Sequence, residues 1–69
     1  MHTNMDKLRG KMAEKKITQE ELAEKIGIDP STFYRKMKTE GTSFTVGQMH
    51  KIVNVLDLSS TEAAAIFLW

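Results

Sequence analysis

The chain has 69 residues, of which 41% are hydrophobic and 28% are charged, and it contains no cysteine. This length permits one small domain, because a chain of about 60 residues buries only roughly 60% of the surface that it exposes when unfolded. The lack of cysteine excludes disulfides, thiolate-bound zinc, iron–sulfur clusters and cysteine nucleophiles. No apolar run approaches the roughly 20 residues that cross a bilayer, and the N-terminus lacks the apolar stretch of a signal peptide, so we expect a cytoplasmic protein.

Charge is distributed unevenly along the chain. Ten Lys and Arg residues oppose nine Asp and Glu residues, for a net charge of +1. The last thirteen residues contain two acidic residues and no basic one, so the preceding part carries three more basic than acidic side chains. Basic residues gather in the first segment and again at Arg35, Lys36 and Lys38, and between them lie Glu20, Glu21 and Glu24. Solvated helix surfaces carry such runs, and so do surfaces that bind an anionic partner.

Helical spacing of apolar residues recurs throughout and predicts an all-α domain with five helices, at about residues 4–15, 18–26, 30–38, 46–56 and 60–67. The second helix begins at Thr18, which forms a Thr-x-x-Glu capping box with Glu21. It ends at Gly27, because glycine adopts the left-handed backbone of a helix terminus without steric cost. Two further capping boxes predict the starts of the fourth and fifth helices: Thr45 with Gln48, and Ser59 with Glu62.

The third helix is expected to start almost directly after the second. Asp29 is a suitable N-cap, and Pro30 suits the first helical position because its missing N–H would have no partner there. Phe33 and Met37 lie four residues apart and define its apolar face. A polar loop with Gly41 follows at residues 38–43.

Two short helices joined by a glycine turn, at about residues 18–38, have the form that reading of the DNA major groove requires. The residues that support this pattern are Gln19, Leu22, Ala23, Ile26, Gly27, Ile28 and Phe33. They resemble the helix-turn-helix of the phage Cro and repressor family, also called the XRE family. The resemblance covers all 69 residues in the order and length of the helices. The chain resembles in particular the short Cro-like regulators of phages and prophages. It implies a compact five-helix lambda-repressor-like fold and a transcriptional repressor that binds a double-stranded DNA operator in the cytoplasm of a bacterial host.

The resemblance also implies which residues read bases. Ser31 matches the second helical position, which commonly touches a base edge, and Arg35 matches a position one turn further on. A guanidinium presents two donors to guanine O6 and N7, which gives about 1–3 kcal/mol of discrimination. The alternative for Arg35 is a solvated side chain or a phosphate contact. Pro30, Thr32 and Tyr34 are further candidates for base contacts.

Two positions depart from the family's pattern. Pro30 stands where relatives often carry a glutamine that reads adenine, and proline offers only an apolar contact, for example to a thymine methyl group. Three residues after Phe33 the family usually has an apolar residue, but this chain has Lys36 there and Met37 one place later. Either the third helix packs with a different roll, or its last turn is distorted.

Phosphate contacts are expected on both sides of the recognition helix. Thr18 and Gln19 lie at the N-terminus of the second helix, where backbone amides favour anions. The other candidates are Lys36, Lys38, Thr39, Thr42 and Ser43. An ordinary surface role is the alternative for each loop residue.

Nothing in the sequence indicates an enzyme or a cofactor. His2 and His50 are 48 residues apart and lack a carboxylate at ligand spacing, so no metal site is expected. No nucleophile–base pair or phosphate loop is present, and no small-molecule ligand is expected.

The last residues, Phe67, Leu68 and Trp69, are unusually apolar. Either Trp69 packs against the first and fourth helices of its own domain, or the apolar end is exposed and signals association. The resemblance implies homodimers on pseudo-palindromic sites, with recognition helices roughly 34 Å apart. Candidate dimer contacts are Val55, Leu58, Phe67 and Trp69. An alternative function on the same fold is a protein-binding antirepressor or adaptor module.

Overall fold

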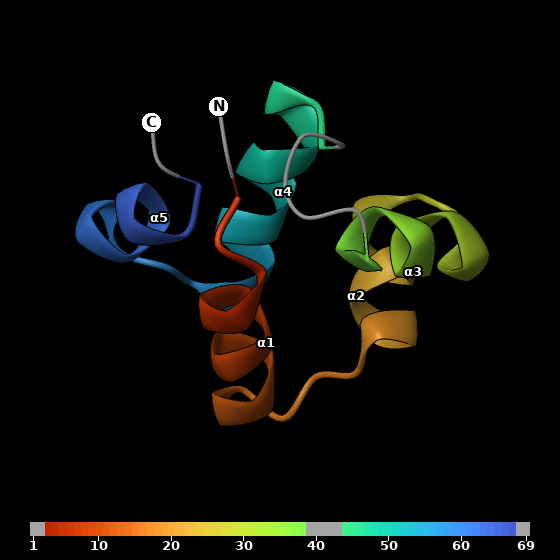
Figure 1. Ribbon diagram of the computed structural model, residues 1–69, viewed down its shortest axis with the longest axis horizontal. Coiled ribbons are helices and arrows are strands. Elements are labelled where there is room, and N and C mark those ends of the chain that lie inside the picture. The colour runs from red at the N-terminus through yellow and green to blue at the C-terminus, as the bar shows by residue number, and fades with distance from the viewer. Residues whose placement is uncertain (1–2, 39–43, 68–69) are drawn as a thin grey trace.

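The computed structural model describes residues 3–38 and 44–67 of the chain. Within these ranges the chain forms five α-helices and no strand, which confirms the all-α prediction. The helices are α1 (Met5–Glu14), α2 (Gln19–Ile26), α3 (Pro30–Lys38), α4 (Val46–Leu56) and α5 (Ser60–Phe67). Figure 1 shows α4 near the middle of the molecule, with α1 and α5 towards one side and the α2–α3 pair on the other.

The helices begin where side chains can bond to the unpaired amides of the first turn. At α2, Thr18 Oγ1 accepts from the Glu21 N–H at 3.0 Å, and the Glu21 carboxylate accepts from the Thr18 N–H at 3.0 Å. The same reciprocal pair of bonds precedes α4 and α5, as the residue spacing predicts: Thr45 with Gln48, and Ser59 with Glu62. At α1 the cap is Asn4, whose side chain accepts from the Lys7 N–H at 3.1 Å.

Apolar side chains from all five helices meet in one core. The α2 and α3 helices pack against each other, and α2 also packs on α4. Phe33 of α3 is fully buried, and its ring lies 5.6 Å from the ring of Phe44, the residue just before the N-cap of α4. These contacts fix the helix-turn-helix onto the rest of the domain.

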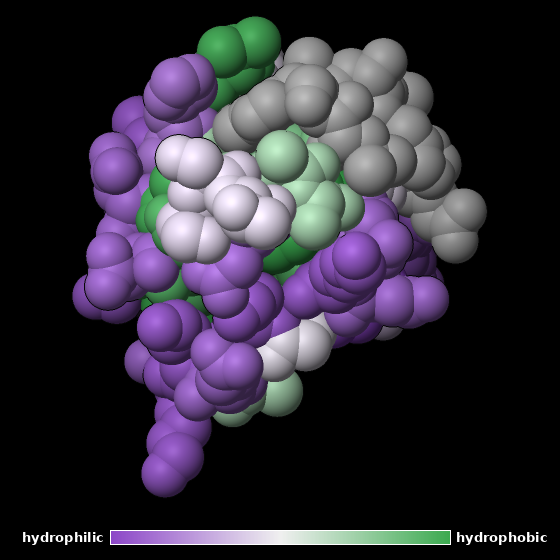
Figure 2. All heavy atoms as spheres, turned by 90° about the vertical axis from the view of Figure 1, so that its left-hand side faces the viewer, coloured by the Kyte–Doolittle hydropathy of each residue, from purple (hydrophilic) through white to green (hydrophobic). Residues whose placement is uncertain are grey.

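The opposite side of the molecule is built by α1 and α5, which pack against each other. The Asn4 N–H donates to the Ile66 carbonyl at 2.5 Å, so the start of α1 is hydrogen-bonded to the last turn of α5. Figure 2 shows this side: side chains of intermediate hydropathy lie in its middle, and hydrophilic side chains surround much of them. None of the helices in the described part of the chain is long and apolar enough to cross a membrane.

Candidate nucleic-acid interface

The turn between α2 and α3 is short because Gly27 adopts a left-handed backbone. Its φ is 80° and its ψ is 28°, a conformation that glycine takes without a Cβ clash. The Ile28 N–H then donates to the Ala23 carbonyl at 3.0 Å, which closes the end of α2. Asp29 Oδ2 accepts from the Ser31 N–H at 2.9 Å, so α3 begins at Pro30, three residues after the glycine.

Two core residues set the orientation of α3. Phe33 and Met37, four residues apart, are 0% and 1% exposed, respectively. The helix continues through Met37 to Lys38, so it packs with a roll that suits these two residues, and its last turn remains helical. Lys36 lies at the edge of this face, half-buried, with its ammonium 5.9 Å from the centre of the Phe44 ring.

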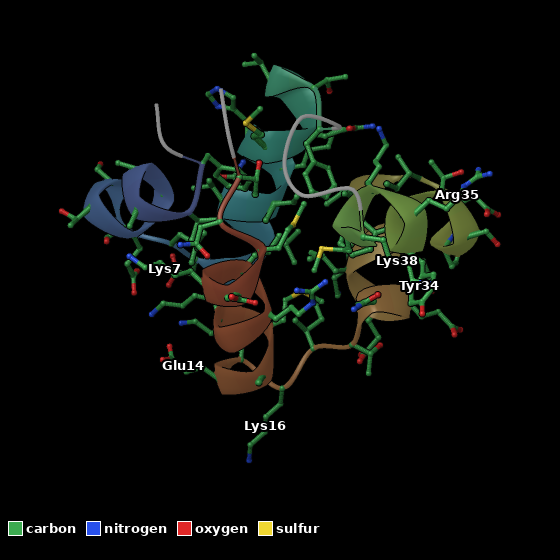
Figure 3. The ribbon with its side chains drawn as sticks, in the orientation of Figure 1. Lys7, Glu14, Lys16, Tyr34, Arg35 and Lys38 are labelled. Atoms are coloured by element: carbon green, nitrogen blue, oxygen red, sulfur yellow. The ribbon has the colours of Figure 1, made fainter. Side chains whose placement is uncertain are left out.

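The outer face of α3 carries the two residues expected to read bases. Ser31 and Arg35 are exposed and lie four residues apart, on the side of the helix that faces away from Phe33. Thr32 is half-buried, and its hydroxyl accepts a hydrogen bond of 3.5 Å from Arg35 Nη2. Figure 3 shows Arg35 on the outer side of the α2–α3 pair, pointing away from the rest of the molecule. A side chain that reads guanine has to be exposed in this way, because it must reach the base edge in the groove.

Tyr34 and Lys38 form a pair beside this face. Tyr34 is 52% exposed, and the Lys38 ammonium lies 4.7 Å from the centre of its ring. The two residues are four positions apart, so the helix brings the cation over the aromatic face. Figure 3 shows both on the α3 side of the molecule. The Tyr34 ring therefore holds the Lys38 ammonium in a defined position on the surface of α3. The remaining base-contact candidate on this helix, Pro30, is exposed at its first position.

The N-terminus of α2 is less open to phosphate than the sequence suggests. Thr18 uses its backbone N–H and its hydroxyl oxygen in the capping box with Glu21. Hydrogen bonds from the Thr18 backbone and hydroxyl lower the pKa of the Glu21 carboxyl, so an ionised carboxylate lies at this helix end. The amide of Gln19, at the first helical position, has no intrahelical partner and is the better-placed donor.

Several of the predicted contact residues lie in the core or outside the described residues. Thr39, Thr42 and Ser43, expected on phosphate, and Trp69, expected at a dimer interface, lie outside the described residues. Leu58 and Phe67 belong to the core, with exposed fractions of 8% and 0%, so they leave little surface for a second subunit. Val55 is half-buried and packs against the core.

The first lysines of the chain lie away from α3. Figure 3 shows Lys7 and Glu14 on the side of the molecule opposite to Arg35. Between α1 and α5 lies an open groove of about 400 Å³ where Lys11 forms ion pairs with Glu14 and Glu62. Its α1 wall carries Lys7, Lys11 and Glu14 and its α5 wall carries Glu62, so the groove does not have the uniformly basic surface expected for binding a polyanion. Among residues 3–38 and 44–67, no group of three or more His, Cys, Asp or Glu side chains is arranged to hold a metal ion.

Arg9 is a structural link to the recognition helix that sequence reasoning missed. Its guanidinium reaches from α1 to α3, where Nη2 donates to the Met37 carbonyl at 3.3 Å. The two residues are 28 positions apart, and neither periodicity nor a motif connects them. The only indication in the sequence was that Arg9 is a basic residue at the border of the apolar face of α1. Several lysines have the same property, so it could not single out Arg9.

A comparison with protein families identifies this arrangement. The sequence profile of the Cro/C1-type HTH DNA-binding domain matches residues 7–64 of the chain. The chain belongs to this family. The match includes all of α2, α3 and α4, and therefore the whole helix-turn-helix. It also includes α1 from its third residue and the first five residues of α5. No curated protein and no solved structure matches the chain.

Membership of the Cro/C1-type family confirms the resemblance drawn from the α2–α3 residues. The chain is a DNA-binding domain of the kind found in transcription regulators, and its partner is double-stranded DNA. In helix-turn-helix domains generally, the second helix of the motif enters the major groove and the first crosses the backbone; the corresponding helices of this chain are α3 and α2. The function that the family's description gives to such a domain is the binding of DNA.

Proposed function

We propose that the chain is a sequence-specific, Cro-like transcriptional repressor that reads its operator with Ser31 and Arg35 of α3. The observation that supports this most directly is the arrangement of α3. Its inner face is anchored by Phe33 and Met37, and its outer face exposes a hydroxyl and a guanidinium one turn apart. Binding would itself be the mechanism, because an occupied operator blocks polymerase or a competing regulator without any chemical step.

The surrounding residues would supply orientation and not sequence preference. Lys38, held over Tyr34, and the amide of Gln19 lie on α3 and at the start of α2, where phosphates of the two strands would pass. Thr39, Thr42 and Ser43 remain candidates for the same role. The small net charge of +1 limits sequence-independent affinity, so base contacts have to supply much of the preference.

A homodimer is part of the proposal, since Cro-type domains would place two recognition helices in successive major grooves roughly 34 Å apart. Val55 and Trp69 are the remaining candidate contacts, because Leu58 and Phe67 are engaged in the core. Sedimentation of the free protein and of its complex with a duplex would test this. A monomer in both states would exclude the dimer.

The direct test is selection of bound duplexes from a random pool. We expect an enriched palindromic sequence with a guanine in each half-site. Arg35→Ala should then reduce operator affinity by about 1–3 kcal/mol and relax the preference at that guanine. Arg35→Lys retains the charge but loses the bidentate geometry, so it should bind random duplexes like the parent and still prefer the operator less. Lys16→Met, which removes a cation at the bottom of the view in Figure 3, well away from Arg35, is the matched control.

A second candidate is a protein-binding antirepressor or adaptor. It is favoured by the exposed acidic side chains of α2, which lie next to α3: Glu20, Glu21 and Glu24. In that case no duplex would be enriched, and any residual binding to DNA would not depend on Arg35. Affinity for DNA would also vary little with salt, because few counterions would be released.

A further inference from the structure

The Arg9 side chain joins two parts of the domain that otherwise make few contacts. Helix α1 packs chiefly on α5, and α3 packs chiefly on α2. Between them, Arg9 Nη2 donates to the Met37 carbonyl at 3.3 Å. Arg9 Nη1 is also 3.6 Å from Asp6 Oδ1, one turn earlier on α1. The Asp6 side chain is 99% exposed, so this ion pair is weak, and the bond to the backbone of α3 is the contact that holds the guanidinium.

The Met37 carbonyl is a strong acceptor because of its place in α3. It belongs to the last turn, where the final four carbonyls of a helix have no intrahelical partner and carry partial negative charge. A guanidinium supplies both a donor and a positive charge at this point. The Arg9 side chain is 46% exposed, so this contact is partly shielded from water.

Helix α3 needs such a contact because its apolar anchors are few. Of its nine residues only Phe33 and Met37 are buried. Two anchors four residues apart lie almost on one line along the helix axis, so they resist rotation about that axis less than they resist translation. The bond from Arg9 adds a third point, away from that line and at the C-terminal end of the helix.

We propose that Arg9 is a positioning residue that sets the angle at which α3 presents Ser31 and Arg35 to DNA. This inference rests on the proposed function. A change of tilt or rotation at the Met37 end moves the outer face of the helix, which carries Ser31 in its first turn and Arg35 in its last turn. A flexible lysine can still reach a phosphate after such a change. A bidentate contact between an arginine and a base tolerates the change less well, because it requires a fixed direction of approach. Loss of Arg9 should therefore reduce sequence preference more than it reduces general affinity for DNA.

The test compares Arg9→Met with Arg9→Lys in the full chain. Methionine keeps a long apolar stem and removes the donors, whereas lysine can still donate to the carbonyl. Affinity for the selected operator and for a random duplex of equal length is measured over a range of salt, at a temperature where circular dichroism shows each variant folded. For Arg9→Met we expect operator affinity to fall about tenfold, with random-duplex affinity and the salt slope nearly unchanged. Arg9→Lys should recover most of the loss.

Two controls separate the possible explanations. Lys7→Met removes another α1 cation, on the side away from α3, and should leave both affinities near those of the parent (Figure 3). In an Arg35→Ala background, Arg9→Met should have a smaller effect than in the parent, because of the two contacts that it orients only that of Ser31 remains.

The inference is overturned if Arg9→Met lowers both affinities equally and reduces the salt slope by about one, since Arg9 would then contact a phosphate itself. An unchanged ratio of operator to random-duplex affinity would also overturn it. These results differ from a failure of the proposed function. If no operator is enriched, or if Arg35→Ala leaves the preference intact, α3 is not the reader and both proposals fall. If Arg35→Ala removes the preference and Arg9→Met does not, only the role of Arg9 is wrong.

Discussion

Lys11 and Glu62 join the first and last helices of the domain. The ammonium of Lys11 on α1 donates to the carboxylate of Glu62 on α5, and it also reaches Glu14 at 3.2 Å. The Glu62 carboxylate additionally accepts from the Ser59 N–H at 2.9 Å. These bonds lower the pKa of Glu62 to about 2, with the bond from Lys11 as the largest cause. The hydrogen bonds to Glu62 and Glu14 in turn raise the pKa of Lys11.

The first prediction concerns the acid stability of the domain. Because the folded-state pKa of Glu62 lies below its ordinary value of 4.5, its contribution to stability is complete above pH 4.5 and is lost as the pH falls towards 2. Glu62→Gln keeps the capping bond to Ser59 and removes the charge. The parent should therefore be more stable than Glu62→Gln at pH 7, and the difference should shrink as the pH approaches 2.

Urea unfolding of both proteins at pH 7, 4 and 2.5 measures this difference directly. Comparison of the two proteins at the same pH cancels the contributions of groups that contact neither Glu62 nor Lys11. A difference that stays constant over this range would show that Glu62 acts as a cap and not through its ion pair.

The second prediction concerns the turn of the helix-turn-helix. Gly27 has a φ of 80°, and no atom lies within 4 Å of the Cβ that a substitution would add. The cost of Gly27→Ala therefore comes from the backbone alone, at about 1 kcal/mol. For a domain of this size the Tm should fall by roughly 4–8 °C.

Gly10→Ala is the matched control, because it also places a Cβ in open space but within the regular backbone of α1. Alanine is the better helix former, so this variant should be more stable than the parent by roughly 0.5–1 kcal/mol. Equal effects of the two substitutions in thermal melts would contradict the conformational explanation.

The third prediction concerns the pair of Tyr34 and Lys38 on α3. A cation–π contact at an exposed site contributes about 0.5–1 kcal/mol. A double-mutant cycle of Tyr34→Leu and Lys38→Met should give a coupling free energy near this value in urea unfolding. Tyr34→Phe keeps the ring and should keep the coupling. Zero coupling would mean that the Tyr34 ring does not hold the Lys38 side chain.

The sequence was sufficient for features that depend on neighbouring residues. The capping boxes, the glycine turn and the start of α3 at Pro30 each follow from residues three or four apart, because one helical turn brings such residues together. The apolar spacing of Phe33 and Met37 likewise indicated the inner face of α3, whereas the outward position of Arg35 was an expectation drawn from the family resemblance. These local patterns were enough to identify the Cro/C1-type fold.

Tertiary packing decided what no spacing encodes. Phe67 and Leu58 read as candidates for a dimer surface, but the packing of α5 on the rest of the domain places them in the core. The bonds of Lys11 to Glu62 and of Arg9 to Met37 join residues 51 and 28 positions apart. Such pairs depend on the direction in which whole helices cross, and that direction is set by the shape of the shared core and not by any local pattern.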